Sequence, residues 1–215
     1  AAALAFDLIE LGHAPATYRR PRGPRRSSEI NVYVTSVAFH RRLAELGCPV
    51  GRKRWDRSAL GWVLKAPAWT RALFASAFAS AEMTTPRLVG GCLANAAVKQ
   101  ADAAAAIFFT ELLTSLGFRC SLARSAQHHL VQIVGGEDEQ LRFLEEVGFC
   151  LAARKRIAAA SCASVAWQRR DLIARRESAR ADALALYAGG RSHRAILDEV
   201  TRTHGVPRGF VNHAL

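Results

Sequence analysis

A helix-forming segment at residues 69–83 carries the residue types in this sequence that are best suited to chemistry. Its central part, ALFASAFASAEMTTP, has small side chains on more than one face and ends on a carboxylate, Glu82. Small side chains let two helices pack with their backbones very close together. If each helix ended in an acid, the paired carboxylates would bind a divalent metal ion between themselves and a phosphodiester. Glu82 is therefore the candidate metal ligand.

The elements around this helix recur along the chain. The first copy reads as a helix from Asp7, an Arg-rich turn, an alternating strand at 30–36, a helix at 39–47 and a basic end at 48–54. The second copy reads as a helix at 110–117, an Arg-containing stretch at 118–125, a strand at 128–136, a helix at 137–148 and a basic end at 149–156. A spacing of about one hundred residues joins the copies. The pattern predicts an α+β fold with antiparallel sheets.

The second copy contains more of the repeating unit than the first. The helix at 69–83 and a short hairpin at 87–100 precede its shared elements, whereas the first copy lacks both. Their counterparts would fall before residue 1, so we expect the first copy to be truncated. The chain has no initial Met.

The charge balance favours a polyanionic partner. The 215 residues include 30 Lys and Arg against 18 Asp and Glu, a formal net charge of +12, and only four of the basic residues are Lys. The planar fork of Arg can donate two hydrogen bonds to one phosphate, so nucleic acid is the leading candidate partner. A GC-rich genome is the alternative explanation for Arg in place of Lys.

The remaining composition bounds the class of protein. The chain is 50% hydrophobic and 22% charged, as expected of a globular protein, and no charge-free apolar run is long enough to span a membrane. Five cysteines without a C-x-x-C pair predict buried thiols in a reducing cytosol rather than disulfides or a structural zinc site.

The C-terminal segment, 177–215, has the pattern of a helix-turn-helix. A helix ends at Gly189-Gly190, Ser192 begins a second helix, and Gly205 precedes a short third one. The predicted core residues are Ala185, Ile196, Val200, Val206 and Val211. The third helix would present Arg208, Asn212 and His213 to a DNA major groove. A plain helical hairpin is the alternative.

At residues 74–86 the sequence resembles a known family. FASAFASAEMTTP resembles the second motif of LAGLIDADG (DOD-type) homing endonucleases of the intein-borne kind. The matching positions are Phe74, Ala77, Phe78, Ala81, Glu82, Thr84, Thr85 and Pro86. The flanking segments VYVTSVAFHRRLAELGCPVGRKR, KAPAW and GEDEQLRFLEEVGFCLAARKR resemble the surroundings of that motif as well. The resemblance covers nearly the whole chain.

The resemblance implies a site-specific endonuclease that cleaves double-stranded DNA. Two αββαββα repeats would form a saddle of antiparallel sheets over the DNA, and the acid ending each motif helix would hold Mg²⁺. On that basis residues 1–66 are the remainder of a first repeat with its linker, 67–176 a second repeat, and 177–215 the helix-turn-helix. Glu82 would be catalytic and bind the metal, and Lys99 would stabilise charge near the cleaved phosphate.

Other basic residues would contact DNA in such an enzyme. The candidates are Arg52, Lys53, Arg54, Arg119, Arg124, Arg154, Lys155 and Arg156, together with Arg208 and Asn212 of the C-terminal segment. Phosphate contacts position a protein without reading sequence, which suits the two basic ends of the copies. A solvated charged face is the alternative for each of these residues.

Only one of the two expected acids is present. Three explanations for the single acid compete. The N-terminal half is missing from the sequence, the chain pairs with a second copy, or it is a decayed remnant that binds DNA without cutting it. The rival hypothesis is a non-catalytic DNA-binding regulator, because a LAGLIDADG-like domain joined to a helix-turn-helix also resembles bacterial sporulation regulators. An RNA-binding cofactor of the same fold is a third alternative. The target sequence and the host gene are not predictable from this sequence.

Overall fold

The structure, a computed structural model, describes residues 2–20, 29–48, 55–56 and 58–215 and divides into two compact units, Ala1–Ala160 and Ser161–Leu215. Helices and small antiparallel sheets together make it an α+β protein, as the sequence predicts. None of the described helices combines the length and apolar character that a membrane span requires. The division into three segments at 66/67 and 176/177 stays a prediction.

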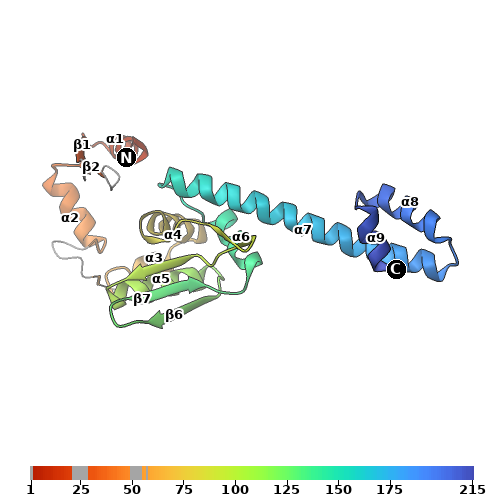
Figure 1. The fold of residues 1–215 in the computed structure, drawn as a ribbon. Coiled ribbons are helices and arrows are strands. Elements are labelled where there is room, and N and C mark those ends of the chain that lie inside the picture. Colours follow the sequence, from red (N-terminus) through yellow and green to blue (C-terminus); the bar gives the residue numbers. More distant parts are fainter. Residues whose placement is uncertain (1, 21–28, 49–54, 57) are drawn as a thin grey trace. The chain divides into compact units, whose positions relative to one another are not determined.

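The first unit holds all the described strands, and Figure 1 traces its elements along the chain. They follow in the order α1 (Ala2–Glu10), β1 (Ala16–Arg20), β2 (Glu29–Tyr33), α2 (Val37–Glu45), α3 (Gly61–Lys65), α4 (Ala68–Glu82), β3 (Leu88–Val89), β4 (Cys92–Leu93), β5 (Ala97–Gln100), α5 (Ala103–Ser115), β6 (Cys120–Arg124), β7 (His129–Ile133) and α6 (Glu137–Glu146). The long helix α7 (Ala153–Ala188) begins in this unit and continues in the second, where α8 (His193–His204) and α9 (Arg208–Ala214) follow.

Both copies of the predicted repeat have the same order of elements. α1–β1–β2–α2 and α5–β6–β7–α6 are each a helix, an antiparallel strand pair and a helix. Glycines with positive φ follow the first helix of each copy, at Gly12 and Gly117, where other side chains would be strained. One expectation was wrong: the Arg-rich stretch begins as strand β1, which includes Arg19 and Arg20, because Thr17 and Tyr18 favour an extended backbone.

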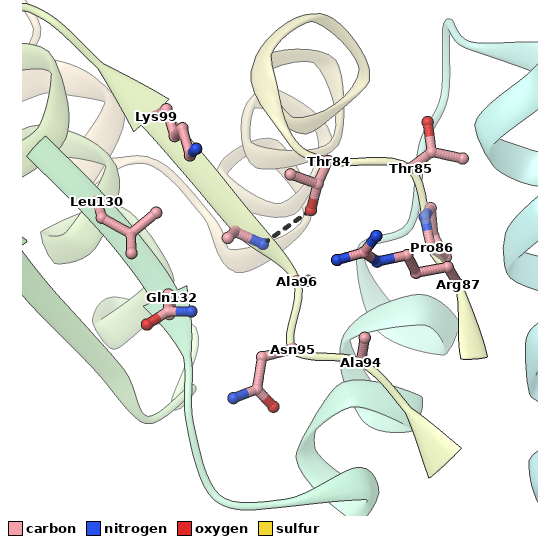
Figure 2. A pocket seen from close by; sticks show the side chains of 11 residues that line it. Thr84, Thr85, Pro86, Arg87, Ala94, Asn95, Ala96, Lys99, Leu130 and Gln132 are labelled. Carbon is pink, nitrogen blue, oxygen red and sulfur yellow. Dashed lines mark hydrogen bonds between the residues drawn. The ribbon is translucent and has the colours of Figure 1, made fainter. Parts of the chain in front are cut away.

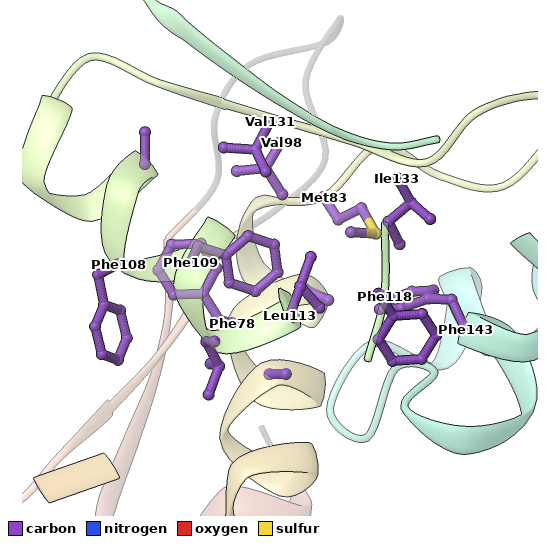
Figure 3. Packing of buried hydrophobic residues seen from close by; sticks show 14 of the residues in the cluster. Phe78, Met83, Val98, Phe108, Phe109, Leu113, Phe118, Val131, Ile133 and Phe143 are labelled. Atoms are coloured by element: carbon purple, nitrogen blue, oxygen red, sulfur yellow. The ribbon is translucent and has the colours of Figure 1, made fainter. Parts of the chain in front are cut away.

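The three-stranded sheet of the second copy, in the order β5-β7-β6, has one face buried against helices. α5 packs across all three strands and also against α4. Figure 3 shows the aromatic centre of this core, where the rings of Phe78 and Phe109 stack with centroids 4.5 Å apart. Val98 and Val131 project into it from paired positions of β5 and β7. Their strand neighbours therefore face away from the core.

Polar side chains of α6 bind backbone groups at one end of this sheet. Gln140, only 1% exposed, accepts a hydrogen bond from the Ala96 N–H at 2.8 Å and donates one to the Ile133 carbonyl at 2.7 Å. One amide side chain thus joins the start of β5 to the end of β7. Buried backbone groups need such partners, because leaving them unpaired is costly.

Glu139 binds the loop before β6. Its Oε1 accepts hydrogen bonds from the Arg119 N–H at 2.8 Å and from Arg142 Nη2 at 2.9 Å. Burial would raise the pKa of Glu139, but these hydrogen bonds and the two Arg charges outweigh it, so the pKa is lowered. A lowered pKa in the folded state stabilises the protein above the ordinary glutamate pKa. That stabilisation is lost as the pH falls through the folded-state value.

In the second unit, α7, α8 and α9 enclose a small core. One prediction about this core was wrong: Ala185 is exposed, and Ala179 and Ala183 are buried with Ile196 and Val200. The helix predicted to end at Gly189-Gly190 is the last part of a single 36-residue helix, because no Gly or Pro interrupts residues 153–188. In a continuous helix, residues four apart share one face, so Ala179 and Ala183 both face this core.

We expect Gln140→Ala to destabilise the first unit, because it leaves the Ala96 N–H and the Ile133 carbonyl without a partner. Each buried unpaired group costs about 1–3 kcal/mol. Urea unfolding measures this loss, and Glu145→Ala on the exposed side of α6 is the matched control. A loss for Gln140→Ala no larger than that of the control would show that the side chain does not hold the two strands.

Candidate functional site

The candidate site begins where α4 ends. Glu82 is the last residue of α4 and is exposed, whereas Met83 is 3% exposed and forms an isolated bridge with Val98 of β5. Thr84 then pairs with Ala97 on both sides: its N–H donates to the Ala97 carbonyl at 2.8 Å, and its Oγ1 accepts from the Ala97 N–H at 3.2 Å. These contacts fix Met83 and Thr84, the segment that follows Glu82, against β5.

This chain borders an open pocket of about 550 Å³ on the sheet face that α5 leaves uncovered. Figure 2 shows how the lining residues lie: Thr84, Thr85, Pro86, Arg87, Ala94, Asn95, Ala96, Ala97, Lys99, Leu130 and Gln132. Among the residues that the structure describes, the lining contains two cations, Lys99 and Arg87, and the amides of Asn95 and Gln132, but no carboxylate. Donors without an acid suit an anionic ligand.

Strand register brings Lys99 to this pocket. Lys99 pairs with Leu130, and Ala97 pairs with Gln132, so these four positions alternate with the buried Val98 and Val131. The sequence singled out Lys99 but missed Arg87, Asn95 and Gln132. The alternation of apolar and polar residues within 97–100 and 129–133 could have indicated which side chains share a sheet face. It does not reveal that β5 pairs with β7, which brings those side chains together.

Two of the small side chains of α4 form hydrogen bonds with another segment of the same chain. Ser76 Oγ accepts a hydrogen bond from the Cys150 N–H at 2.8 Å, and Ser80 Oγ accepts one from the Leu151 N–H at 3.0 Å. The sequence predicted that these small positions pack against another helix. On this face the partner is instead the loop between α6 and α7. The Ser76 and Ser80 hydroxyls, one helical turn apart, accept hydrogen bonds from two successive N–H groups of that loop.

Another stripe of α4 faces outward. Trp69 and Leu73 have exposed fractions of 71% and 55%, and Ala77 and Ala81 continue the stripe at four-residue spacing, half-buried and exposed. Residues four apart share one face of a helix. The exposed stripe therefore runs along α4 towards the turn that carries Glu82.

Lys155 lies at the same helix end. Its Nζ donates to the carbonyl oxygens of Ala79 at 3.1 Å and of Ser80 at 2.8 Å. Burial lowers the pKa of Lys155, and the negative charge of Glu82 partly opposes this. The sequence assigned Lys155 to DNA phosphate, together with Arg154 and Arg156. In the structure its ammonium is engaged with α4, while the two arginines are exposed on the first turn of α7.

The other predicted residues are spread over the first unit. Arg119 bends back so that its Nη2 donates to the Gly135 carbonyl at 3.4 Å. Arg124 is the last residue of β6 rather than a flanking residue, and it pairs with His129. The alternation of β6 assigns it to the sheet face opposite Lys99. Arg52, Lys53 and Arg54 lie outside the described residues.

The second unit has the predicted helix-turn-helix elements. Ser192 Oγ accepts from the Ala195 N–H and begins α8, and Gly205, with φ 62°, ends it. Asn212 and His213 are exposed on α9, as is Arg208, but the Arg208 guanidinium is paired with Asp198 of α8. A polar pocket of about 220 Å³ between α7 and α8 contains His204, whose Nε2 lies 2.7 Å from Asp182 Oδ2.

A divalent cation has few ligands here. No group of three or more His, Cys, Asp or Glu side chains is arranged around a possible ion within the described ranges. Glu82 alone offers one carboxylate at the helix end. Mg²⁺ binds proteins through one or two carboxylates and takes its other ligands from water and phosphate, so Glu82 fits as one half of a shared site.

Comparison of the sequence with models of known protein families yields no match, and comparison with curated proteins yields none either.

We expect Ser76→Ala with Ser80→Ala to expose the amides of Cys150 and Leu151. Alanine favours the helix itself, so overall stability is a poor measure. Amide hydrogen exchange reports the loop directly, and both amides should lose protection while the core amides of α5 keep theirs. Ser178→Ala, at an exposed position of α7, is the control. Unchanged protection of the two amides would contradict the assigned hydrogen bonds.

Proposed function

We propose that this chain is part of a site-specific DNA endonuclease of the LAGLIDADG homing type. The observation that carries the proposal is the position of Glu82, which ends a helix of small residues and leads through Thr84 into an acid-free pocket with two cations. A metal-binding acid beside a phosphate-binding surface is the arrangement that phosphodiester cleavage requires.

The order of elements supports the proposal. α4, β3, β4, β5, α5, β6, β7 and α6 follow in the order αβββαββα, which has one short strand more than the αββαββα order of a repeat of that family. The uncovered sheet face carries Lys99 and Gln132, and side chains of this kind can contact phosphates and base edges. In the proposed enzyme this face would lie against double-stranded DNA.

Each residue of the site has a role in this proposal. Mg²⁺ would polarise the phosphate and lower the pKa of a bound water. Glu82 would hold that ion, and the Lys99 ammonium would stabilise negative charge at the phosphate. Arg87 would bind a neighbouring phosphate through its guanidinium fork.

A second acidic helix completes the proposed site. It would come from a second copy of the chain or from a segment of a longer protein outside residues 1–215. The outward stripe of α4, from Trp69 to Ala81, is the surface on which such a helix would pack. Apolar side chains of the first copy are exposed too, including Phe6 at 62% and Leu11 at 66%. Contiguous exposed apolar surface is typical of an interaction site.

The second candidate is a DNA-binding regulator without nuclease activity. It is favoured by the helix-turn-helix elements of the second unit and by the single carboxylate, that of Glu82, at the end of α4. Both candidates bind double-stranded DNA, so they differ only in cleavage.

We expect Lys99→Ala to weaken binding to mixed-sequence duplex DNA and to reduce its salt dependence. Each phosphate contact that is lost lowers the slope of log K against log salt by about 0.9, because fewer counterions are released. Arg124→Ala removes the same charge from the other sheet face and should change the slope less. Fluorescence anisotropy over a salt series measures both variants. A flat salt response of the wild-type protein would contradict nucleic-acid binding.

We expect the wild-type protein to nick a supercoiled plasmid library in the presence of Mg²⁺ and Glu82→Gln to lose this activity. The amide keeps the size of the side chain but is a poor metal ligand. DNA affinity should be unchanged, and Glu145→Gln on exposed α6 should nick like the wild type. DNA binding without nicking by either protein would favour the regulator.

A further inference from the structure

The last turn of α4 lacks a basic residue of its own. The final carbonyls of a helix have no partner within it, and the negative end of the helix dipole lies there. α4 has no Lys or Arg in this turn, and its last residue is the acid Glu82. Two sources of negative potential therefore coincide at the end of the helix.

Lys155, from the first turn of α7, meets this negative end. Its Nζ donates to two successive carbonyls, those of Ala79 and Ser80, and lies 5.8 Å from the centre of the Phe149 ring. The next backbone hydrogen bond of α4, from the Met83 N–H to the Ala79 carbonyl at 3.0 Å, shares one of these acceptors. A lysine side chain can bind the last carbonyls of a helix in this way.

We propose that Lys155 is a positioning residue for Glu82. It holds the turn that carries the carboxylate by binding the carbonyls of Ala79 and Ser80. The inference rests on the proposed function only in assigning a metal-binding role to Glu82. The arrangement of Lys155, the Ala79 and Ser80 carbonyls and Glu82 is independent of that function.

The charged groups to consider for Lys155 come from two helices. Glu82 ends α4, and Arg154 and Arg156 flank Lys155 on α7. Among these, Glu82 acts on Lys155 by raising its pKa against the effect of burial. Removing that carboxylate must then lower the pKa of Lys155 further.

The test is a pH titration of the lysine side chains by NMR. The sequence has only four lysines, Lys53, Lys65, Lys99 and Lys155, so their signals are readily assigned with single Lys→Arg variants. In the full chain, Lys155 should titrate below the ordinary pKa of a lysine side chain. In Glu82→Gln the pKa of Lys155 should fall further, and in Glu145→Gln it should not move. A Lys155 pKa that is the same with and without the Glu82 carboxylate would overturn the proposal.

The positioning role is tested by amide exchange. Lys155→Met should speed exchange of the Met83 amide about tenfold, because a hydrogen bond from a charged donor to the same carbonyl is lost. Lys155→Arg keeps a cation with several donors and should restore most of the protection. Unchanged exchange in Lys155→Met would overturn the role in holding the turn.

These results separate the inference from the proposed function. Coupling between Glu82 and Lys155 in a protein that binds DNA but never nicks it would support the positioning role and contradict the nuclease. Nicking that needs Glu82 in a protein without this coupling would support the nuclease and contradict the role of Lys155.

Discussion

The C-terminal half of α4 is held by hydrogen bonds from a segment more than seventy residues further along the chain. Two serine hydroxyls accept the N–H groups of Cys150 and Leu151, and Lys155 binds the carbonyls of the next turn. Without these partners, partly buried N–H groups of the loop and the Ser80 carbonyl at the helix end would lose their hydrogen bonds. The exposed carboxylate of Glu82 therefore rests on a helix end whose order depends on residues 150–155.

The same principle operates at one end of the three-stranded sheet. Gln140 and Glu139 bring side-chain acceptors and donors to backbone groups that the strand ladders leave unpaired. Strands β5 and β7 are consequently fixed against each other, and this pairing brings Lys99 and Gln132 to one face. The pocket is thus built on a rigid sheet, and its polar side chains project from positions that the core determines.

The two copies of the repeat differ in how they are covered. In the second copy α5 is buried by α4 and the sheet, and Phe108, Phe109 and Leu112 are completely inaccessible. In the first copy Phe6, Ile9 and Leu11 are largely exposed, although the order of elements is the same. Burial of such side chains is the main source of folding free energy, so the first copy contributes less to stability than the second.

The sequence by itself determined many of the elements and their order, but it missed strands β1 and β6 and the continuity of α7. Periodicity and capping residues predicted the helices at 69–83 and 137–148, the helix after Ser192, and the repeat of about one hundred residues, because local backbone preferences act over a few residues. It also pointed to Glu82 and Lys99 through a resemblance. Tertiary structure alone decided that Arg87, Asn95 and Gln132 join Lys99, that Ser76 and Ser80 bind a loop, and that Lys155 binds a helix end. These contacts depend on strand register and on pairing across long stretches of chain, which hydrophobic packing of the whole fold selects and which no local pattern encodes.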